Sequence, residues 1–360
     1  MVVCRINTVF FSDCAMKLQM PFIQLPIAFD ANLLATEIAE LGEGPWRPHP
    51  QGFAGNSMLP LVAIGGDAAN ESFTGAMQPT PELQRCPYLW QVFDSLGATI
   101  GRSRLMRLSG HAEVSRHADQ GYYWTDRVRV HVPIVTQPTV RFECGDATIH
   151  MAAGECWIFD TWRQHRVIND ATDSRVHLVV DTVGGGGLWD LIGRGRSHNI
   201  PRGAGAGAGG WQAMLVPPQA GRVEPFPCET INVPVVMSPW ELNSHLSLLF
   251  ADAVPHPQLQ PVRASALRFA RAWQGLWFQF GDRPEGHAQF RQTLTAFLEE
   301  VSGPAQPLLL NNELHWFTAL MAMVGTVAIS SQTKAASHDE YGSDDDHVAS
   351  RPAATPGTMR

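Results

Sequence analysis

Hydrophobic and polar residues change their spacing along this chain of 360 residues. Between residues 100 and 182 they alternate at every second position, in short runs separated by turn signals such as Ser109-Gly110 and Gly145-Asp146. A period of two is typical of half-buried strands. Strands are predicted at 102–108, 112–117, 127–135, 139–144, 148–151, 155–159, 164–168 and 175–181. So many short strands in about eighty residues indicate an antiparallel sandwich or barrel of jelly-roll type.

The region before these strands has helical spacing. A helix is predicted over Ala31–Leu41 with Asp30 as its N-cap, because an aspartate side chain can accept bonds from the first backbone N–H groups. A second helix is predicted over Pro79–Leu96, where Pro87 should kink or split it because proline has no backbone N–H. Both helices are expected to pack on one outer face of the β region.

Glycine ends the β pattern after residue 183. Residues 184–224 are predicted to be a flexible glycine-rich linker, since no Lys-Ser/Thr follows the glycines as it would in a phosphate-binding loop. Helical spacing returns at 238–253, 259–280, 284–301 and 311–329. The predicted organisation is an N-terminal extension (1–19, with Met16 or Met20 as alternative starts), a mainly β domain (20–183), the linker (184–224), a smaller helical segment (225–330) and a disordered acidic tail (331–360).

Composition narrows the class of protein. A charged fraction of 17%, a hydrophobic fraction of 44% and a formal net charge of −8 describe a folded protein that is not a general nucleic-acid binder. No apolar run reaches the roughly eighteen residues that span a membrane, and no signal-peptide pattern opens the chain, so a cytoplasmic location is predicted. The six cysteines form no CxxC pair and are expected to be free thiols, with a Cys144–Cys156 disulfide as the alternative.

One short string suggests the chemistry. His117 and Asp119 are two residues apart, so in an extended chain their side chains point to the same face. Together with the downstream His165 they make a 2-His-1-carboxylate set, which leaves positions open on iron(II) for a co-substrate and dioxygen.

Basic residues share faces of the predicted strands beside this set. Arg127, Arg129 and His131 alternate with valines on one strand, and Arg175 and His177 do so on another. Exposure to solvent is the ordinary interpretation of each strand taken singly. Several such strands in one small barrel favour instead an inward-facing basic pocket around a metal, suited to a dicarboxylate. We interpret His111, His150 and His177 as structural.

The order of these motifs resembles the aspartyl/asparaginyl β-hydroxylase family of iron(II)- and 2-oxoglutarate-dependent oxygenases, and the lay-out is similar to that of proline cis-hydroxylases. The resemblance extends over about residues 20–183. It implies a double-stranded β-helix, which is a cupin-like jelly roll, with flanking helices. The residues that carry it are Arg104–Gly110, His117-x-Asp119, Arg129–Pro133, Ala153–Asp160, His165, Asn169 and Arg175–Asp181.

The resemblance also implies roles for individual residues. His117, Asp119 and His165 would be the iron ligands and catalytic residues, and Arg175 would hold the distal carboxylate of 2-oxoglutarate. Arg129 and His131 would help to bind this co-substrate, and Arg104 and Arg127 would contact an acidic substrate. Met106 occupies a position that can hold a hydroxyl residue in the family.

The expected activity is hydroxylation of an unactivated C–H bond with iron(II), 2-oxoglutarate and dioxygen, yielding succinate and carbon dioxide. The substrate would be a free amino acid, or an Asp, Asn or Pro residue of a peptide or protein. Two alternatives from other classes are a jelly-roll sensor that binds a dicarboxylate without catalysis and a zinc-loaded cupin. The segment 225–330 would shape the substrate entrance or form the face of a homodimer.

Overall fold

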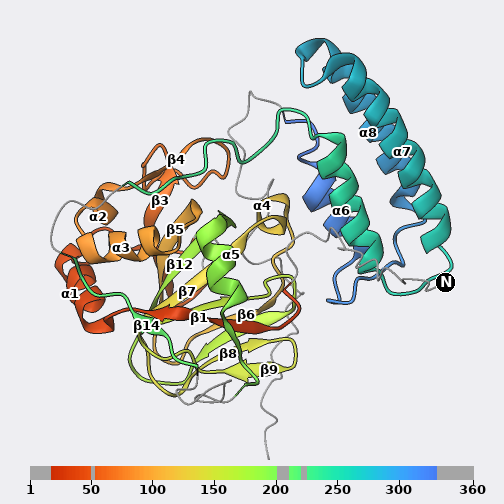
Figure 1. The fold of residues 1–360 in the computed structure, drawn as a ribbon. Coiled ribbons are helices and arrows are strands. Elements are labelled where there is room, and N and C mark those ends of the chain that lie inside the picture. Colours follow the sequence, from red (N-terminus) through yellow and green to blue (C-terminus); the bar gives the residue numbers. More distant parts are fainter. Residues whose placement is uncertain (1–17, 50–52, 201–210, 220–224, 331–360) are drawn as a thin grey trace, which may run out of the picture. The chain divides into compact units, whose positions relative to one another are not determined.

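A computed structural model describes residues 18–49, 53–200, 211–219 and 225–330 (Figure 1). Contacts divide the described chain into two compact units, one made of residues 18–235 with Ser330 and one of residues 236–329. Within the described ranges, no helix is long and apolar enough to cross a lipid bilayer. The predicted acidic tail and the predicted extension up to Lys17 lie outside these ranges, and the five-part domain organisation stays a prediction.

The first unit is built on a large sheet. Its strands are β1 (Phe22–Ala28), β2 (Arg47–Pro48), β3 (Asn56–Ile64), β4 (Met77–Pro79), β5 (Thr99–Leu108), β7 (Val128–Val135), β10 (Glu155–Phe159), β12 (Arg175–Gly184), β13 (Arg196–Ser197) and β14 (Met214–Leu215). The main path runs β13-β1-β10-β7-β12-β5-β3-β2, while β14 pairs with β1 and β4 pairs with β3. The neighbours β10, β7, β12 and β5 at its centre are all antiparallel.

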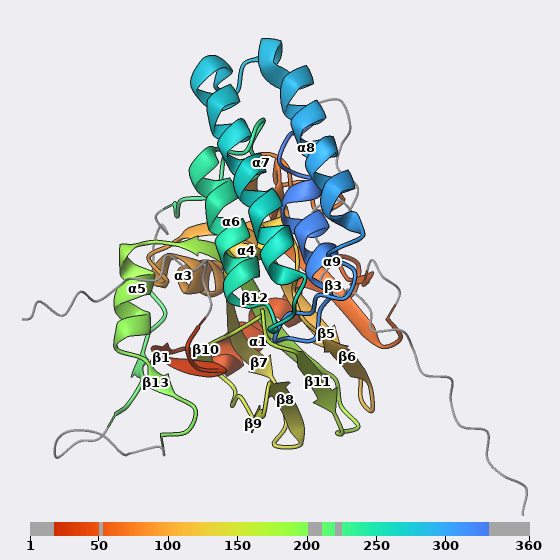
Figure 2. The same cartoon turned by 90° about the vertical axis from the view of Figure 1, so that its right-hand side faces the viewer.

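A smaller antiparallel sheet completes the β region (Figure 2). Its strands are β6 (Glu113–His117), β8 (Val140–Cys144), β9 (Ala147–Ile149) and β11 (His165–Asn169), in the order β6-β11-β8-β9. One hydrophobic core joins the two sheets, because Phe142 and Val167 of the small sheet cluster with Phe22, Trp157 and Phe159 of the large sheet. The predicted jelly-roll class is confirmed.

The alternation of β12 explains how charged residues enter this interior. Val176, Leu178 and Val180 occupy one face of the strand, and Arg175, His177, Val179 and Asp181 occupy the other. Every one of these side chains is buried. Exposure to solvent, the ordinary interpretation of cationic residues on an alternating strand, is therefore wrong for Arg175 and His177.

The helices before the β region follow their local signals. Helix α1 (Ala31–Leu41) begins after Asp30, whose carboxylate accepts hydrogen bonds from the N–H groups of Asn32 and Leu33. The second predicted helix is split at Pro87 into α2 (Pro81–Gln84) and α3 (Pro87–Ser95). Because α1 contacts both α3 and β7, these helices cover the large sheet on the side away from the small one.

The glycine-rich stretch after β12 is more ordered than predicted. Gly186–Gly193 form helix α5, which buries Leu188 and Leu191. The prediction of a flexible linker is therefore wrong here, because these two apolar side chains outweigh the low helix propensity of the surrounding glycines. The GAGAGAGG run lies outside the described residues.

The second unit is helical, as predicted. It contains α6 (Pro239–Ala251), α7 (Leu259–Phe280), the 3-10 turn η1 (Pro284–Gly286), α8 (His287–Ser302), α9 (Trp316–Leu320) and the π-helical turn η2 (Met321–Gly325). Its core is aromatic: Phe269 stacks on Phe297 with ring centroids 4.3 Å apart, and Trp273 packs against Phe290. The single helix expected over 311–329 is thus two short elements.

The cysteines that the structure describes, Cys86, Cys144, Cys156 and Cys228, are free thiols. Cys144 lies on β8 of the small sheet, whereas Cys156 lies on β10 of the large sheet. The two strands are not neighbours, so the alternative of a disulfide between them is wrong.

Candidate metal centre and co-substrate pocket

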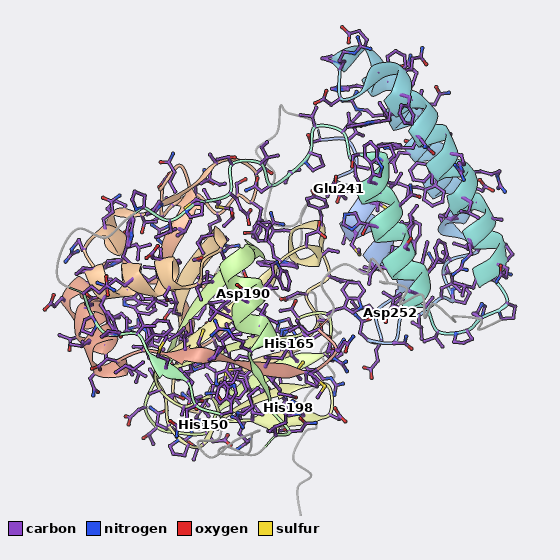
Figure 3. The ribbon with its side chains drawn as sticks, viewed as in Figure 1. His150, His165, Asp190, His198, Glu241 and Asp252 are labelled. Atoms are coloured by element: carbon purple, nitrogen blue, oxygen red, sulfur yellow. The ribbon has the colours of Figure 1, made fainter. Side chains whose placement is uncertain are left out.

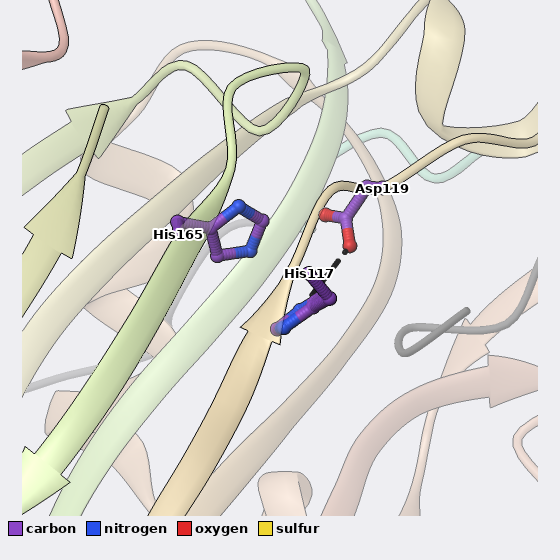
Figure 4. A group of neighbouring side chains, drawn as sticks. All are labelled: His117, Asp119 and His165. Carbon is purple, nitrogen blue, oxygen red and sulfur yellow. Dashed lines mark ion pairs between the residues drawn. The ribbon is translucent and has the colours of Figure 1, made fainter. Parts of the chain in front are cut away.

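His117, Asp119 and His165 meet at one end of the small sheet, with their side chains turned toward one another (Figure 4). His117 ends β6 and His165 begins β11, and the two are paired directly across these strands. Asp119 lies just beyond β6, where its backbone N–H donates to Thr161 O at 2.9 Å. One potential ligand atom from each of the three side chains lies within 4.8 Å of the others, and all three residues are buried.

Both histidines are held in the tautomer that a metal ligand requires. Nδ1 of His117 lies 2.7 Å from Ser115 O, and Nδ1 of His165 lies 2.8 Å from Arg163 O. Because a carbonyl oxygen can only accept, each Nδ1 carries the proton and each Nε2 carries the lone pair. Burial, together with the nearby His117, holds the pKa of His165 well below its ordinary value, so its ring is neutral at neutral pH.

This donor set fits iron(II). Two imidazole nitrogens and one carboxylate, all buried, make up the donor set of the facial triad found in non-haem iron oxygenases. His117 Nε2 lies 3.7 Å from Asp119 Oδ1, so these two atoms already converge. The carbonyl acceptors behind the rings supply the outer contacts that orient metal-binding histidines.

A pocket opens beside the triad, between the two sheets. The residues that line it are His49, Asn56, Arg104, Met106, Val114, His117, Arg129, His131, Phe142, Phe159, His165, Val167, Arg175 and Val179. It therefore brings together all the predicted site residues except Asp119 and Arg127. The two triad histidines come from the small sheet, whereas the basic residues Arg104, Arg129, His131 and Arg175 come from strands of the large sheet.

Arg175 is a buried cation in this pocket. Among the described residues, its Nε and one terminal nitrogen have no hydrogen-bond partner, and its guanidinium carbon lies 5.9 Å from the centre of the Phe142 ring. Burial lowers its pKa to about 10, which still leaves it charged at neutral pH. A buried charge without a partner is costly, so this arrangement fits an anion that binds from outside the chain.

Two buried histidines lie next to Arg175. Neither ring nitrogen of His131 or of His177 has a hydrogen-bond partner among the residues that the structure describes. Burial lowers the pKa of both well below the ordinary range, and the charge of Arg175 lowers them further. A neutral imidazole can donate one hydrogen bond to a carboxylate. His177 does not line the pocket and stacks on Phe142, so its interpretation as a structural residue stays a prediction.

The other histidines labelled in Figure 3 along with His165 do not reach the pocket. Nδ1 of His150 bonds to Val140 O at 3.0 Å, and the ring of His198 packs against Phe22. The structural interpretation of His150 agrees with this contact.

Arg129 lines the pocket but is engaged by carboxylates of the chain itself. Its terminal nitrogen lies 2.9 Å from Asp119 Oδ2, and its Nε donates to Asp181 Oδ1 at 3.0 Å. Its guanidinium also lies over the Trp124 ring, 4.3 Å from the centroid. Asp181 and Trp124 were not predicted as site residues, because nothing in their spacing indicates these contacts.

Arg127 lies away from the pocket. It precedes β7, and its guanidinium makes two bonds to the Glu229 carboxylate, at 3.0 and 2.7 Å, and one to Tyr123 O. The predicted alternation therefore fails at this residue, since the strand has not begun. The predicted contact between Arg127 and substrate is not supported by this geometry, whereas Arg104 lines the pocket.

Comparison with known families agrees with this site. The sequence model of the aspartyl/asparaginyl β-hydroxylase family matches residues 69–184, the range that holds the triad, Arg175, His131 and Arg129. Over residues 69–184 the predicted resemblance to this family is confirmed, and the matched range begins later than the expected residue 20.

The curated proteins similar to this chain include a proline hydroxylase. The L-proline cis-3-hydroxylase 1 of Streptomyces sp. is 29% identical over 172 residues, which cover 42% of this chain and 54% of the relative. The chain thus spans about half the length of this curated relative. Similar solved structures include a 2OG-Fe(II) oxygenase-family oxidoreductase from Burkholderia pseudomallei (15% identity, 47% of this chain, 88% of that chain, TM-score 0.33) and a Pseudomonas putida prolyl-4-hydroxylase (16%, 46%, 92%, 0.31).

Proposed function

We propose that this chain is an iron(II)- and 2-oxoglutarate-dependent dioxygenase that hydroxylates an unactivated C–H bond. The observation that carries this proposal is the presence of the His117, Asp119 and His165 set and of the buried, unpaired guanidinium nitrogens of Arg175 around one pocket. A metal site alone would fit many activities. The added cation selects a co-substrate with a carboxylate at some distance from its metal-binding end, which describes 2-oxoglutarate.

Each group of residues has a separate task. His117, Asp119 and His165 would hold the iron, while Arg175 and His131 would bind the distal carboxylate, the guanidinium through its planar pair of N–H groups. Bound iron(II), 2-oxoglutarate and dioxygen supply the oxidising power, with succinate and carbon dioxide as co-products. The protein's own contribution is to orient these groups and to keep water out, and the apolar side chains of Phe142, Phe159 and Val179 in the pocket wall serve the second purpose.

The substrate would be an amino acid, either free or as an Asp, Asn or Pro residue of a peptide. The proline hydroxylase among the relatives supports this class, and the buried Arg104 in the pocket wall supports a substrate with a carboxylate. A cytoplasmic location, the absence of nucleic-acid partners and a homodimer stay predictions. The dicarboxylate sensor is less favoured, since a sensor has no need for three converging metal ligands.

Anaerobic spectroscopy tests this proposal without requiring the substrate. Iron(II) and 2-oxoglutarate added to the purified chain should produce the visible charge-transfer band of an iron(II)–2-oxo acid complex. The band should be absent in His165→Ala, and Arg175→Met should require a much higher 2-oxoglutarate concentration to develop it. Full development of the band in His165→Ala would contradict the proposal.

A further inference from the structure

Three buried side chains connect the carboxylate of Asp119 to the large sheet. Asp181 on β12 and Arg129 on β7 are paired directly across neighbouring strands. Arg129 Nε donates to Asp181 Oδ1 at 3.0 Å, and a terminal nitrogen of the same guanidinium forms an ion pair with Asp119 Oδ2 at 2.9 Å. We infer that Asp181 and Arg129 are positioning residues that orient Asp119 and balance the charge beside it for metal binding. This inference rests on the proposed function.

The geometry gives the two oxygens of Asp119 different surroundings. Oδ2 faces the guanidinium of Arg129, whereas Oδ1 lies 3.7 Å from His117 Nε2, on the side of the histidines. The guanidinium is hydrogen-bonded to Asp181 and ion-paired with Asp119, so its position is tied to both carboxylates. The Trp124 ring below Arg129 restricts it further. Asp119 is therefore held with one oxygen toward the metal position.

The charges explain why Asp181 is needed. Arg129 is a cation in direct contact with a metal ligand, and a divalent ion next to an uncompensated cation would be repelled. Asp181 supplies the compensating charge, and its side chain is almost fully buried. Arg102, a second buried cation, also interacts electrostatically with Asp181. Removing the charge of Asp181 would take away one of the two carboxylates that Arg129 contacts and leave it the metal ligand Asp119.

An ion pair with a purely structural role would affect stability but not metal binding. The same unit contains such a pair, which serves as a control. Arg127 and Glu229 form an ion pair at 2.7 Å with side-chain exposures of 5% and 2%, comparable with 8% and 1% for Arg129 and Asp181. The Arg127–Glu229 pair contacts no member of the triad. Glu229→Gln therefore reproduces the loss of a buried carboxylate charge without touching Asp119.

The test is a cobalt(II) titration of the full chain, followed through the visible absorption of the bound ion. We expect Asp181→Asn to weaken cobalt(II) binding by about 10- to 100-fold, the usual effect of losing an outer contact to a metal ligand. Glu229→Gln should leave the affinity within about twofold of the wild type, although both variants lower the melting temperature. Adding Arg129→Gln to Asp181→Asn removes the uncompensated cation and should recover part of the affinity.

The possible outcomes separate this inference from the proposed function. Unchanged cobalt(II) affinity in Asp181→Asn, or equal weakening in Glu229→Gln, would overturn the inference while the metal site stands. A cobalt(II) spectrum that is the same in the wild type and in His165→Ala would overturn both the inference and the proposed function. If Asp181→Asn does not fold, Arg129→Lys provides the same test: one ammonium group cannot span both carboxylates, so weaker binding is expected and wild-type affinity would refute the positioning role.

Discussion

His117 and His165 face each other across β6 and β11 with ring centroids 4.2 Å apart, and each bonds through Nδ1 to the carbonyl oxygen two residues before it. The same local contact thus orients both rings. It depends only on the backbone of the residue's own segment, so both Nε2 atoms are placed before any metal binds. Pre-orientation of this kind reduces the cost of assembling the site.

Loss of any one triad side chain should abolish turnover. His117→Ala, Asp119→Ala and His165→Ala each remove one of three donors, so succinate formation should fall to the background level. His150→Ala is the control, because His150 bonds to Val140 O and lies outside the pocket wall. Residual turnover in His165→Ala above the background would show that this histidine is not a ligand.

Arg175→Met should make the protein more stable and less able to use its co-substrate. Two guanidinium nitrogens of this buried cation have no hydrogen-bond partner among the described residues, so an apolar side chain of similar length should raise the free energy of unfolding by about 1–3 kcal/mol. The KM for 2-oxoglutarate should rise at least about tenfold, because the guanidinium that would bind its distal carboxylate is gone. Urea unfolding and succinate kinetics measure the two effects.

The control for the predicted gain of stability in Arg175→Met is Arg127→Met. It leaves the Glu229 carboxylate buried and unpaired, so the free energy of unfolding should fall by about 3–5 kcal/mol. A loss of stability of this size in Arg175→Met as well would show that Arg175 has an internal partner and is not reserved for an anion.

Acid should destabilise the metal-free protein. His131, His165 and His177 have folded-state pKa values well below the ordinary value, mainly because of burial. Below about pH 6.5 the unfolded chain therefore binds more protons than the folded one. The contribution of these histidines to the free energy of unfolding is fully present above this pH and is lost as the pH falls. Each histidine adds up to about 1.4 kcal/mol per pH unit.

Urea unfolding between pH 5 and 8 in the presence of a chelator measures this slope. His177→Phe should reduce this slope by the contribution of one histidine. The variant should still fold, because a Phe ring can stack on Phe142 as the His177 ring does. His111→Asn should leave it unchanged, because His111 is exposed and asparagine tolerates its positive φ of 59°. An unchanged slope in His177→Phe would mean that His177 binds protons equally in the folded and unfolded states, which would contradict its lowered pKa.

Gly154 has a structural role in the Gly-Glu-x-Trp motif. Its φ is +80°, and a Cβ there would lie 2.2 Å from Phe29 O. Gly154→Ala should therefore cost about 3 kcal/mol or more of folding free energy. Gly275→Ala is the control: no atom lies within 4 Å of its Cβ position in the exposed face of α7, so the effect should be neutral or stabilising. A melting temperature unaffected by Gly154→Ala would contradict the contact.

The spacing of residues predicts much of this fold, since strands and caps depend on local patterns. β10 covers Glu155–Phe159, as predicted, and α1 begins after its Asp30 cap. The period of two also places Arg129 and His131 on the inward face. Helix α5 was not predicted because the run of four glycines has a low helix propensity, and the two buried leucines that stabilise the helix are too few to show its period.

Partners distant in the sequence could not be predicted. Arg127 and Arg129 are two residues apart on either side of Val128, yet one pairs with Glu229 and the other with Asp119 and Asp181. Which carboxylate meets which guanidinium depends on where β7 begins and on a segment about a hundred residues downstream. Spacing indicates the face of a strand, whereas the partner comes from tertiary packing.

Succinate formation tests the central claim most directly. Proton NMR would follow 2-oxoglutarate in air with iron(II), ascorbate and purified protein, against free amino acids and peptides that contain Asp, Asn or Pro. We predict iron-dependent succinate that is accelerated by one member of the panel and is absent in His117→Ala. Succinate formation that is independent of iron or unaffected by His117→Ala, or wild-type protein that binds no iron, would contradict the account.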